Sequence, residues 1–121
     1  MRSGFGPQKS KHFRNAISGV VVSADEILPR WDALKGAVRI NGHLVSEPCT
    51  TGSRWTLGEA LAHVSRSERL TPGEVFATGT LPGGSGIETG RLLAPGDTVA
   101  LAIEGVGTLS NRIASEDQGS P

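Results

Sequence analysis

Residues 35–47 read K-G-A-V-R-I-N-G-H-L-V-S-E, and this stretch decides the local fold of the chain. Its centre, Asn41-Gly42, is typical of a two-residue type I′ turn, because both turn positions need a positive φ that Asn and Gly tolerate. Branched and apolar residues stand on both sides of the pair, as the strands of a hairpin require. The stretch therefore predicts a β-hairpin with strands at residues 35–40 and 43–47.

Short apolar runs predict further strands elsewhere in the chain. Residues 17–22, I-S-G-V-V-V, favour a buried strand because branched side chains suit extended backbone. A second run follows at residues 74–78. Residues 98–104, T-V-A-L-A-I-E, alternate well enough for a half-buried strand, and a tight reversal at residues 105–107 leads into a last run at 108–113. The pattern predicts a mainly β domain.

One helix is predicted, and it begins at Thr56. Thr56 and Glu59 have the spacing of a capping box, in which a hydroxyl and a carboxylate satisfy free N–H groups at the helix start. The turn L-T-P-G at residues 70–73 is expected to end the helix. Apolar residues recur at helical spacing on one face, namely Leu57, Ala60, Leu61 and Val64.

Length, charge and cysteine content narrow the class of protein. The chain has 121 residues, which suits one domain or a piece of one. Lys and Arg number 12, as do Asp and Glu, and this balance argues against non-specific binding to nucleic acid or to an anionic membrane. No apolar run reaches the roughly 18 residues that span a bilayer. The lone Cys49 forms no internal disulfide, which fits a reducing compartment. We expect a cytoplasmic protein without a nucleic-acid or membrane partner.

A glycine-rich loop, T-G-T-L-P-G-G-S-G-I-E-T-G at residues 78–90, is the candidate functional feature. No lysine follows its glycines, which excludes the phosphate loop of nucleotide hydrolases, and Thr89 stands where the dinucleotide fingerprint needs its third glycine. Backbone N–H groups and the hydroxyls of Thr78 and Thr80 remain, next to Glu88, and such donors suit a carboxylate or an oxyanion. The alternative interpretation is that the loop is only a structural connection and binds nothing. No ligand spacing joins the three histidines, His12, His43 and His63.

Two longer runs carry a resemblance to a known family. The run L-T-P-G-E-V-F-A-T-G-T at residues 70–80, followed by P-G-D-T-V-A-L-A-I-E-G-V-G-T-L-S-N-R-I at 95–113, resembles the C-terminal part of the fumarylacetoacetate hydrolase family. The segment G-P-Q-K-S-K-H-F at 6–13 and the hairpin match the family in the same order. The likeness therefore covers residues 6–113, with an irregular start at 1–5 and a polar tail at 114–121 that we expect to be disordered.

The resemblance implies a fold, a chemistry and a set of site residues. It implies part of a mixed β-sandwich roll, a homodimer, and an enzyme acting on a 2-oxo or diketo acid by C–C bond hydrolysis, decarboxylation or hydration. The substrate would chelate Mg²⁺, or Mn²⁺ or Ca²⁺, and the cation would polarise its carbonyl. Lys11, favoured over Lys9, matches the active-site lysine that stabilises enolate charge. Thr80, with the Gly79 backbone, matches the contact to the substrate carboxylate.

The remaining site residue, Glu88, has two interpretations. It matches the acid that orients a catalytic histidine in the hydrolase branch, or it is an ordinary surface acid on a glycine turn. The family's metal ligands, a Glu-x-Glu pair and an Asp, and its catalytic histidine match positions upstream of this chain, and no ligand spacing joins Asp25, Glu26 and Asp32. Two hypotheses follow. The chain is a fragment of a metal-dependent enzyme, or it is a truncated non-catalytic relic or dimerising interaction module.

Overall fold

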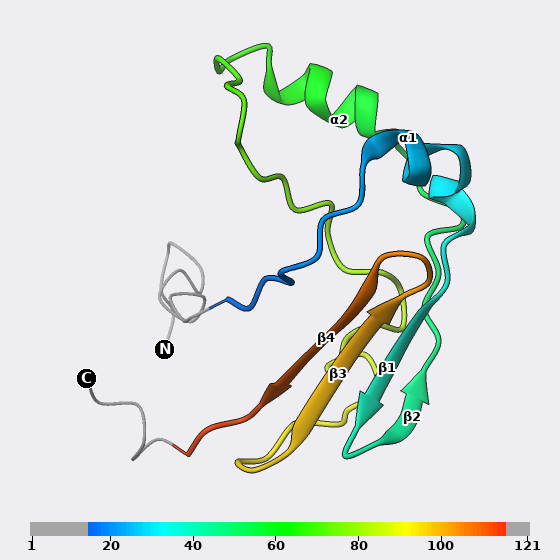
Figure 1. Ribbon diagram of the computed structural model, residues 1–121, viewed down its shortest axis with the longest axis vertical. Coiled ribbons are helices and arrows are strands. Elements are labelled where there is room, and N and C mark those ends of the chain that lie inside the picture. The colour runs from blue at the N-terminus through cyan, green and yellow to red at the C-terminus, as the bar shows by residue number, and fades with distance from the viewer. Residues whose placement is uncertain (1–14, 116–121) are drawn as a thin grey trace.

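The computed structural model describes residues 15–115, and Figure 1 shows their arrangement around one sheet. Lys11, Lys9, the start at residues 1–5 and most of the predicted tail lie outside the described residues. The elements in chain order are α1 (Ala24–Ile27), the 3₁₀ helix η2 (Leu28–Ala33), β1 (Gly36–Ile40), β2 (His43–Ser46), α2 (Leu57–Val64), β3 (Thr98–Ile103) and β4 (Gly107–Arg112).

The four strands form one antiparallel sheet in the order β2-β1-β3-β4. The predicted hairpin is confirmed, because β1 and β2 flank a turn in which Asn41 has φ 51° and Gly42 has φ 81°. The strands predicted at residues 98–104 and 108–113 are confirmed as β3 and β4, each to within one residue. The mainly β fold class predicted from the sequence is therefore correct.

The turn of the first hairpin is fastened to the start of β3. The Asn41 backbone N–H donates to the Thr98 carbonyl at 2.9 Å, and the Thr98 N–H donates to the Asn41 side-chain oxygen at 2.9 Å. The Asn41 side-chain amide also donates to Asp97 at 2.8 Å, and Asp97 accepts from the Ala94 N–H at 2.9 Å. The three bonds of Asn41 join segments more than 50 residues apart and help to fix the register of β1 against β3.

Residues paired across neighbouring strands share one face of the sheet. Val38 lies opposite Leu101, and Leu101 lies opposite Leu109, which makes an apolar row across three strands. We call the side with this row the apolar face and the opposite side the small-residue face. The apolar face carries Val38, Ile40, Val99, Leu101, Ile103 and Leu109, and the small-residue face carries Ala37, Ala100, Ala102, Thr108 and Ser110.

The core is small and lies near β1. Leu34 is 4% exposed and Ile40 is 6% exposed, and they are the only large apolar side chains buried among residues 15–115. Leu34 is held from both sides by Thr50, whose N–H donates to the Leu34 carbonyl and whose hydroxyl accepts from the Leu34 N–H, each at 3.0 Å. Gly36 is also buried, and a side chain there would meet the Pro48 carbonyl at 3.1 Å.

Helix α2 begins as predicted and ends early. The Thr56 hydroxyl accepts from the Glu59 N–H at 3.2 Å, and the Glu59 carboxylate accepts from the Thr56 N–H at 2.8 Å, which confirms the capping box. The helix stops at Val64, whereas the sequence placed its end at the turn of residues 70–73. The apolar stripe ends at Val64 as well, and Ser65, a weak helix former, caps the helix with its N–H bonded to the Leu61 carbonyl.

Two predicted strands are wrong. Residues 17–22 and 74–78 form no strand, and their side chains are open to solvent, with Ile17 77%, Val21 91% and Val75 83% exposed. The physical reason is that a strand needs a neighbouring edge to satisfy its backbone donors and acceptors. Neither segment pairs with a strand in the described part of the chain, so β propensity alone leaves both extended and unpaired.

Candidate functional site

The glycine-rich loop closes on itself through local hydrogen bonds. The Glu88 carboxylate accepts from the Ser85 N–H at 3.2 Å, and the Glu88 N–H donates to the Ser85 carbonyl at 3.1 Å. The Arg91 N–H then donates to the Gly86 carbonyl at 2.9 Å. Glu88 therefore sits in a Ser-x-x-Glu arrangement of the same kind as the pair Thr56 and Glu59, and here it fastens a turn.

The loop needs glycine because its backbone approaches itself closely. A Cβ added at Gly86 would lie 2.3 Å from the Arg91 carbonyl oxygen, and one added at Gly84 would lie 2.8 Å from the Leu81 carbonyl oxygen. Gly83 has a positive φ of 75°, which a side chain would strain. These positions explain the density of glycine without assigning it to catalysis.

The loop packs against the first hairpin on the apolar face. It passes behind the sheet in the view of Figure 1, and the Ser46 hydroxyl donates to the Gly83 carbonyl at 2.5 Å. A cleft of about 440 Å³ remains between loop and hairpin, with Val38, Ile40 and Leu44 on the strand side. Arg91 and Thr89 line the opposite side, so this cleft combines an apolar floor with one cation.

A second cleft, of about 350 Å³, lies where the loop begins. Thr78 and Gly79 line it together with Trp31, Leu34 and Ile103. Gly79 has φ 94°, so the backbone turns at the point where Thr78 leaves this cleft and Thr80 begins the loop. Thr78 therefore faces the apolar wall of this cleft, whereas Thr80, on the other side of Gly79, does not line it.

Thr80 is exposed, and its hydroxyl makes no hydrogen bond with any residue from 15 to 115. The structure does not join Thr80 to Glu88, because no hydrogen bond and no shared cleft connects the two side chains within the described residues. Gly79 therefore borders a cleft, the Thr80 hydroxyl has no hydrogen-bond partner within residues 15–115, and Glu88 fastens the loop turn. Lys11, the fourth predicted site residue, lies outside the described part of the chain.

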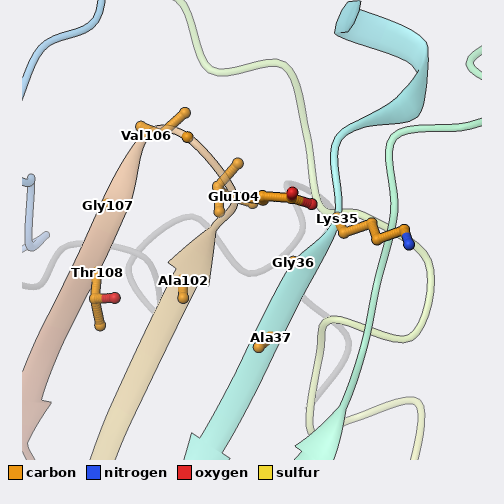
Figure 2. A pocket seen from close by; sticks show the side chains of 10 residues that line it. Lys35, Gly36, Ala37, Ala102, Glu104, Val106, Gly107 and Thr108 are labelled. Atoms are coloured by element: carbon orange, nitrogen blue, oxygen red, sulfur yellow. The ribbon is translucent and has the colours of Figure 1, made fainter.

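A broad hollow of about 600 Å³ lies on the small-residue face near the β3–β4 turn. Figure 2 shows Ala37, Ala102 and Thr108 on neighbouring strands, with Lys35 extending away from Glu104. No ion pair joins the two charges, and no nucleophile stands beside an acid or base in this hollow. This open hollow offers no catalytic arrangement.

The described residues do not by themselves fit a divalent metal ion. Residues 15–115 contain no group of three or more His, Cys, Asp or Glu side chains close enough to hold one. A hard cation such as Mg²⁺ binds through carboxylate oxygens and water, so carboxylates from outside this region would be required to bind one.

Residues 15–115 also contain no helix with the length and apolar character that a membrane crossing needs.

Two polar residues that contact or line the loop were not predicted from the sequence. Ser46 anchors the loop through the Gly83 carbonyl, and Arg91 supplies the cation of the larger loop cleft. Arg91 directly follows Gly90, the last glycine of the loop. A cation at the end of a glycine-rich loop could have been proposed as a binding residue. Ser46 gave no signal, because its contact joins residues 37 positions apart.

Comparison with known proteins places these features in a family. The family model described as fumarylacetoacetate (FAA) hydrolase C-terminal matches residues 2–114. An uncharacterized protein of Staphylococcus saprophyticus is 31% identical over 101 residues, which are 83% of this chain and 33% of that protein. An uncharacterized protein of Staphylococcus aureus is 32% identical over 95 residues, 78% of this chain and 31% of that protein.

A solved structure agrees with the sequence matches. The crystal structure of a candidate HpcE protein from Mycobacterium smegmatis superposes with a TM-score of 0.67 at 34% identity, covering 78% of this chain and 35% of that one. The chain belongs to the fumarylacetoacetate hydrolase family, as its two long runs indicated. It spans about a third of the length of the relatives that it matches.

Proposed function

We propose that this chain is the C-terminal portion of a divalent-metal-dependent enzyme that acts on a 2-oxo or diketo acid. The observation that carries the proposal is the family match over residues 2–114, which includes the Thr-Gly-Thr start of the glycine-rich loop. The reaction is C–C bond hydrolysis or the related decarboxylation or hydration. The same fold supports several chemistries, so the family alone does not choose among them.

The role of this chain in the proposal is to bind the substrate carboxylate. Thr80 is exposed and its hydroxyl is not used within the described residues, so it is free to donate to an incoming carboxylate. Gly79, with its positive φ, lets the backbone turn so that amide and hydroxyl can approach one anion. Hydrogen bonds to a charged group contribute about 1.5–3 kcal/mol, enough to orient a small acid.

The proposed site has three further parts, of which Lys11 and Glu88 belong to this chain and the cation does not. Lys11 would stabilise negative charge on the enolate, and the cation, Mg²⁺ or Mn²⁺ or Ca²⁺, would take its ligands from outside residues 15–115. Glu88 already accepts the Ser85 N–H, which supports a role in shaping the loop. A homodimer and a cytoplasmic location belong to the same proposal.

A second candidate function is a non-catalytic interaction module. The absence of a carboxylate cluster within residues 15–115 and the many exposed apolar side chains favour it. The two candidates differ in one respect, which is turnover after the chain is joined to the part of a relative that it does not match.

The carboxylate contact is tested in a single-chain chimera in which residues 2–114 replace the matching segment of the mycobacterial relative. We expect Thr80→Val to raise KM for a 2-oxo acid roughly tenfold or more, because the hydroxyl donor is lost. Thr80→Ser keeps the donor and should retain a KM near that of the unaltered chimera. Equal KM values for both variants would show that the Thr80 hydroxyl does not contact the substrate carboxylate.

A further inference from the structure

Strand β2 contains a β-bulge that decides on which face Ser46 lies. Ser46 pairs with Val38 of β1. The next pair is Leu44 with Arg39, so Val45 is an extra residue without a partner on β1. A regular strand alternates its side chains between the two faces of a sheet, and one extra residue reverses this alternation beyond it. The bulge therefore puts Ser46 on the apolar face, against which the glycine-rich loop packs.

The bulge brings Ser46 to a hydrogen bond that ties the glycine-rich loop to the sheet. The Ser46 hydroxyl donates to the Gly83 carbonyl at 2.5 Å. Within residues 15–115, no other hydrogen bond joins residues 78–91 to another segment, because the remaining bonds of the loop close on the loop itself. β-Bulges are frequent next to functional sites, where they redirect a single side chain. The position of the loop against β2 therefore depends on this hydroxyl.

The carbonyl that Ser46 binds belongs to a stiff turn directly after Thr80. The Gly84 N–H donates to the Leu81 carbonyl at 2.9 Å, which closes a four-residue turn. Pro82 fixes φ at the second position of this turn, and Gly83 has the positive φ, 75°, that the third position of a type II turn requires. A restraint on Gly83 therefore reaches Thr80 through a short and stiff connection.

The two neighbours of Thr80 also border the sheet. Gly79 and Leu81 both line the cleft whose wall includes the buried Leu34. Thr80 lies between them and is exposed. Its segment is thus held by packing on one side and by the Ser46 bond beyond the turn. An exposed side chain on a segment held in this way can meet a ligand at a fixed place.

We propose that Ser46 is a positioning residue for the carboxylate contact assigned to Thr80. The inference rests on the proposed function, because Ser46 acts through Thr80 and does not touch the substrate. The Ser46 hydroxyl holds the turn after Thr80 against β2, so the Thr80 hydroxyl is in place before the substrate arrives. Without this bond the loop has more freedom, and the substrate must order it on binding, which weakens binding.

The proposal is tested by the kinetics of Ser46→Ala in the chimera, with whichever of oxaloacetate, acylpyruvates or fumarylacetoacetate the chimera turns over. We expect KM to rise about three- to tenfold with kcat nearly unchanged, because an ordering cost weakens ground state and transition state alike. Ser46→Thr keeps the hydroxyl and should restore KM. Ser65→Ala is the matched control, since it removes a hydroxyl that donates to the Ala62 carbonyl at 3.0 Å at the end of α2. It should leave KM unchanged.

A double-mutant cycle separates positioning from a general structural role. In the Thr80→Val chimera, the added Ser46→Ala change should not raise KM further, because the contact that Ser46 positions is already lost. Equal increases in both backgrounds would overturn the proposal. So would a KM that Thr80→Val raises and Ser46→Ala does not, and the carboxylate contact of Thr80 would then stand. If neither change raised KM, the carboxylate contact and the positioning role would both be wrong.

A second measurement needs no turnover. Amide chemical shifts of the 121-residue chain are compared with those of Ser46→Ala, Ser46→Thr and Ser65→Ala. We expect the Thr80 and Gly83 amide shifts to change in Ser46→Ala and to stay nearly constant in the other two variants. An unchanged Thr80 shift in Ser46→Ala would overturn the proposal. If a folded chimera has no turnover, the proposed function fails, and the Thr80 shift alone decides whether Ser46 positions Thr80.

Discussion

Asn41 and Asp97 are 56 residues apart in sequence, and a hydrogen bond of 2.8 Å joins their side chains. The same aspartate accepts the Ala94 N–H, so one carboxylate ties the first hairpin to the turn that precedes β3. The pKa of Asp97 is lowered from its ordinary value of 3.8, first by the Ala94 N–H bond, then by Asn41, and further by the positive charge of Arg91. We therefore expect the link between the two hairpins to depend on pH.

A lowered carboxyl pKa predicts loss of stability in acid. The contribution is fully present above the ordinary pKa of 3.8 and is lost as the pH falls through the lower folded-state pKa. We expect the urea midpoint of the chain to fall as the pH is lowered from about 5 toward 3, and the fall to be smaller in Asp97→Asn. If the urea midpoint fell equally with pH in Asp97→Asn and in the unaltered chain, the Asp97 carboxylate would not contribute to this pH dependence.

The type I′ turn predicts a specific cost at Gly42. Its φ is 81° and nothing lies within 4 Å of an added Cβ, so Gly42→Ala meets strain in the backbone and no steric clash. We expect a loss of about 1–2 kcal/mol in the free energy of unfolding. Gly19→Ala is the matched control, because Gly19 also has free space around it and its φ is not positive. An equal effect of both changes would contradict the turn assignment.

The capping box predicts the stability of α2. Thr56→Ala removes the hydroxyl that accepts the Glu59 N–H and should lower the free energy of unfolding by about 1 kcal/mol. Thr56→Ser keeps the oxygen and should cost much less. Urea titration followed by far-ultraviolet circular dichroism measures both variants, and indistinguishable midpoints would refute the contribution of the cap.

The close approach inside the glycine-rich loop predicts a local rearrangement. Gly86→Ala would place a methyl group 2.3 Å from the Arg91 carbonyl oxygen, so the loop must shift. We expect a loss of roughly 1–3 kcal/mol, as overpacking commonly causes, and changed amide chemical shifts at Gly83 and Ser46. Unchanged shifts at these two residues would show that the loop and the hairpin are not coupled through the Ser46 hydroxyl.

The fold was predictable wherever the signal is local. Asn41-Gly42 fixes its own turn and Thr56 with Glu59 fixes its own cap, so both could be identified from neighbouring residues. Residues 17–22 could not, because strand formation depends on a partner edge that local sequence does not provide. Helix α2 ends at Val64, where its apolar stripe stops. The proline-glycine turn at residues 70–73 is a stronger stop signal, and it led to a predicted end that lies too far along the chain.

The site was predictable only in part. Gly79 and Thr80 are assigned from a motif, and their contact with a substrate carboxylate stays a prediction. The structure shows that Thr80 is exposed and that its hydroxyl makes no hydrogen bond within residues 15–115. The contact of Ser46 with Gly83 joins distant segments and could not be read from spacing. The bond from the Ser85 N–H to Glu88 follows Ser-x-x-Glu spacing and favours the second of the two interpretations of Glu88, a surface acid on a glycine turn.

The central claim is that this chain supplies the carboxylate side of a 2-oxo acid enzyme whose metal ligands come from the rest of the polypeptide. The most direct measurement compares turnover of oxaloacetate, acylpyruvates and fumarylacetoacetate by the 121-residue chain and by the chimera, with Mg²⁺ and with a chelator. We predict no turnover by the chain alone and Mg²⁺-dependent turnover of at least one substrate by the chimera. Turnover by the chain alone, or a folded chimera inactive on all three with Mg²⁺, would contradict the account.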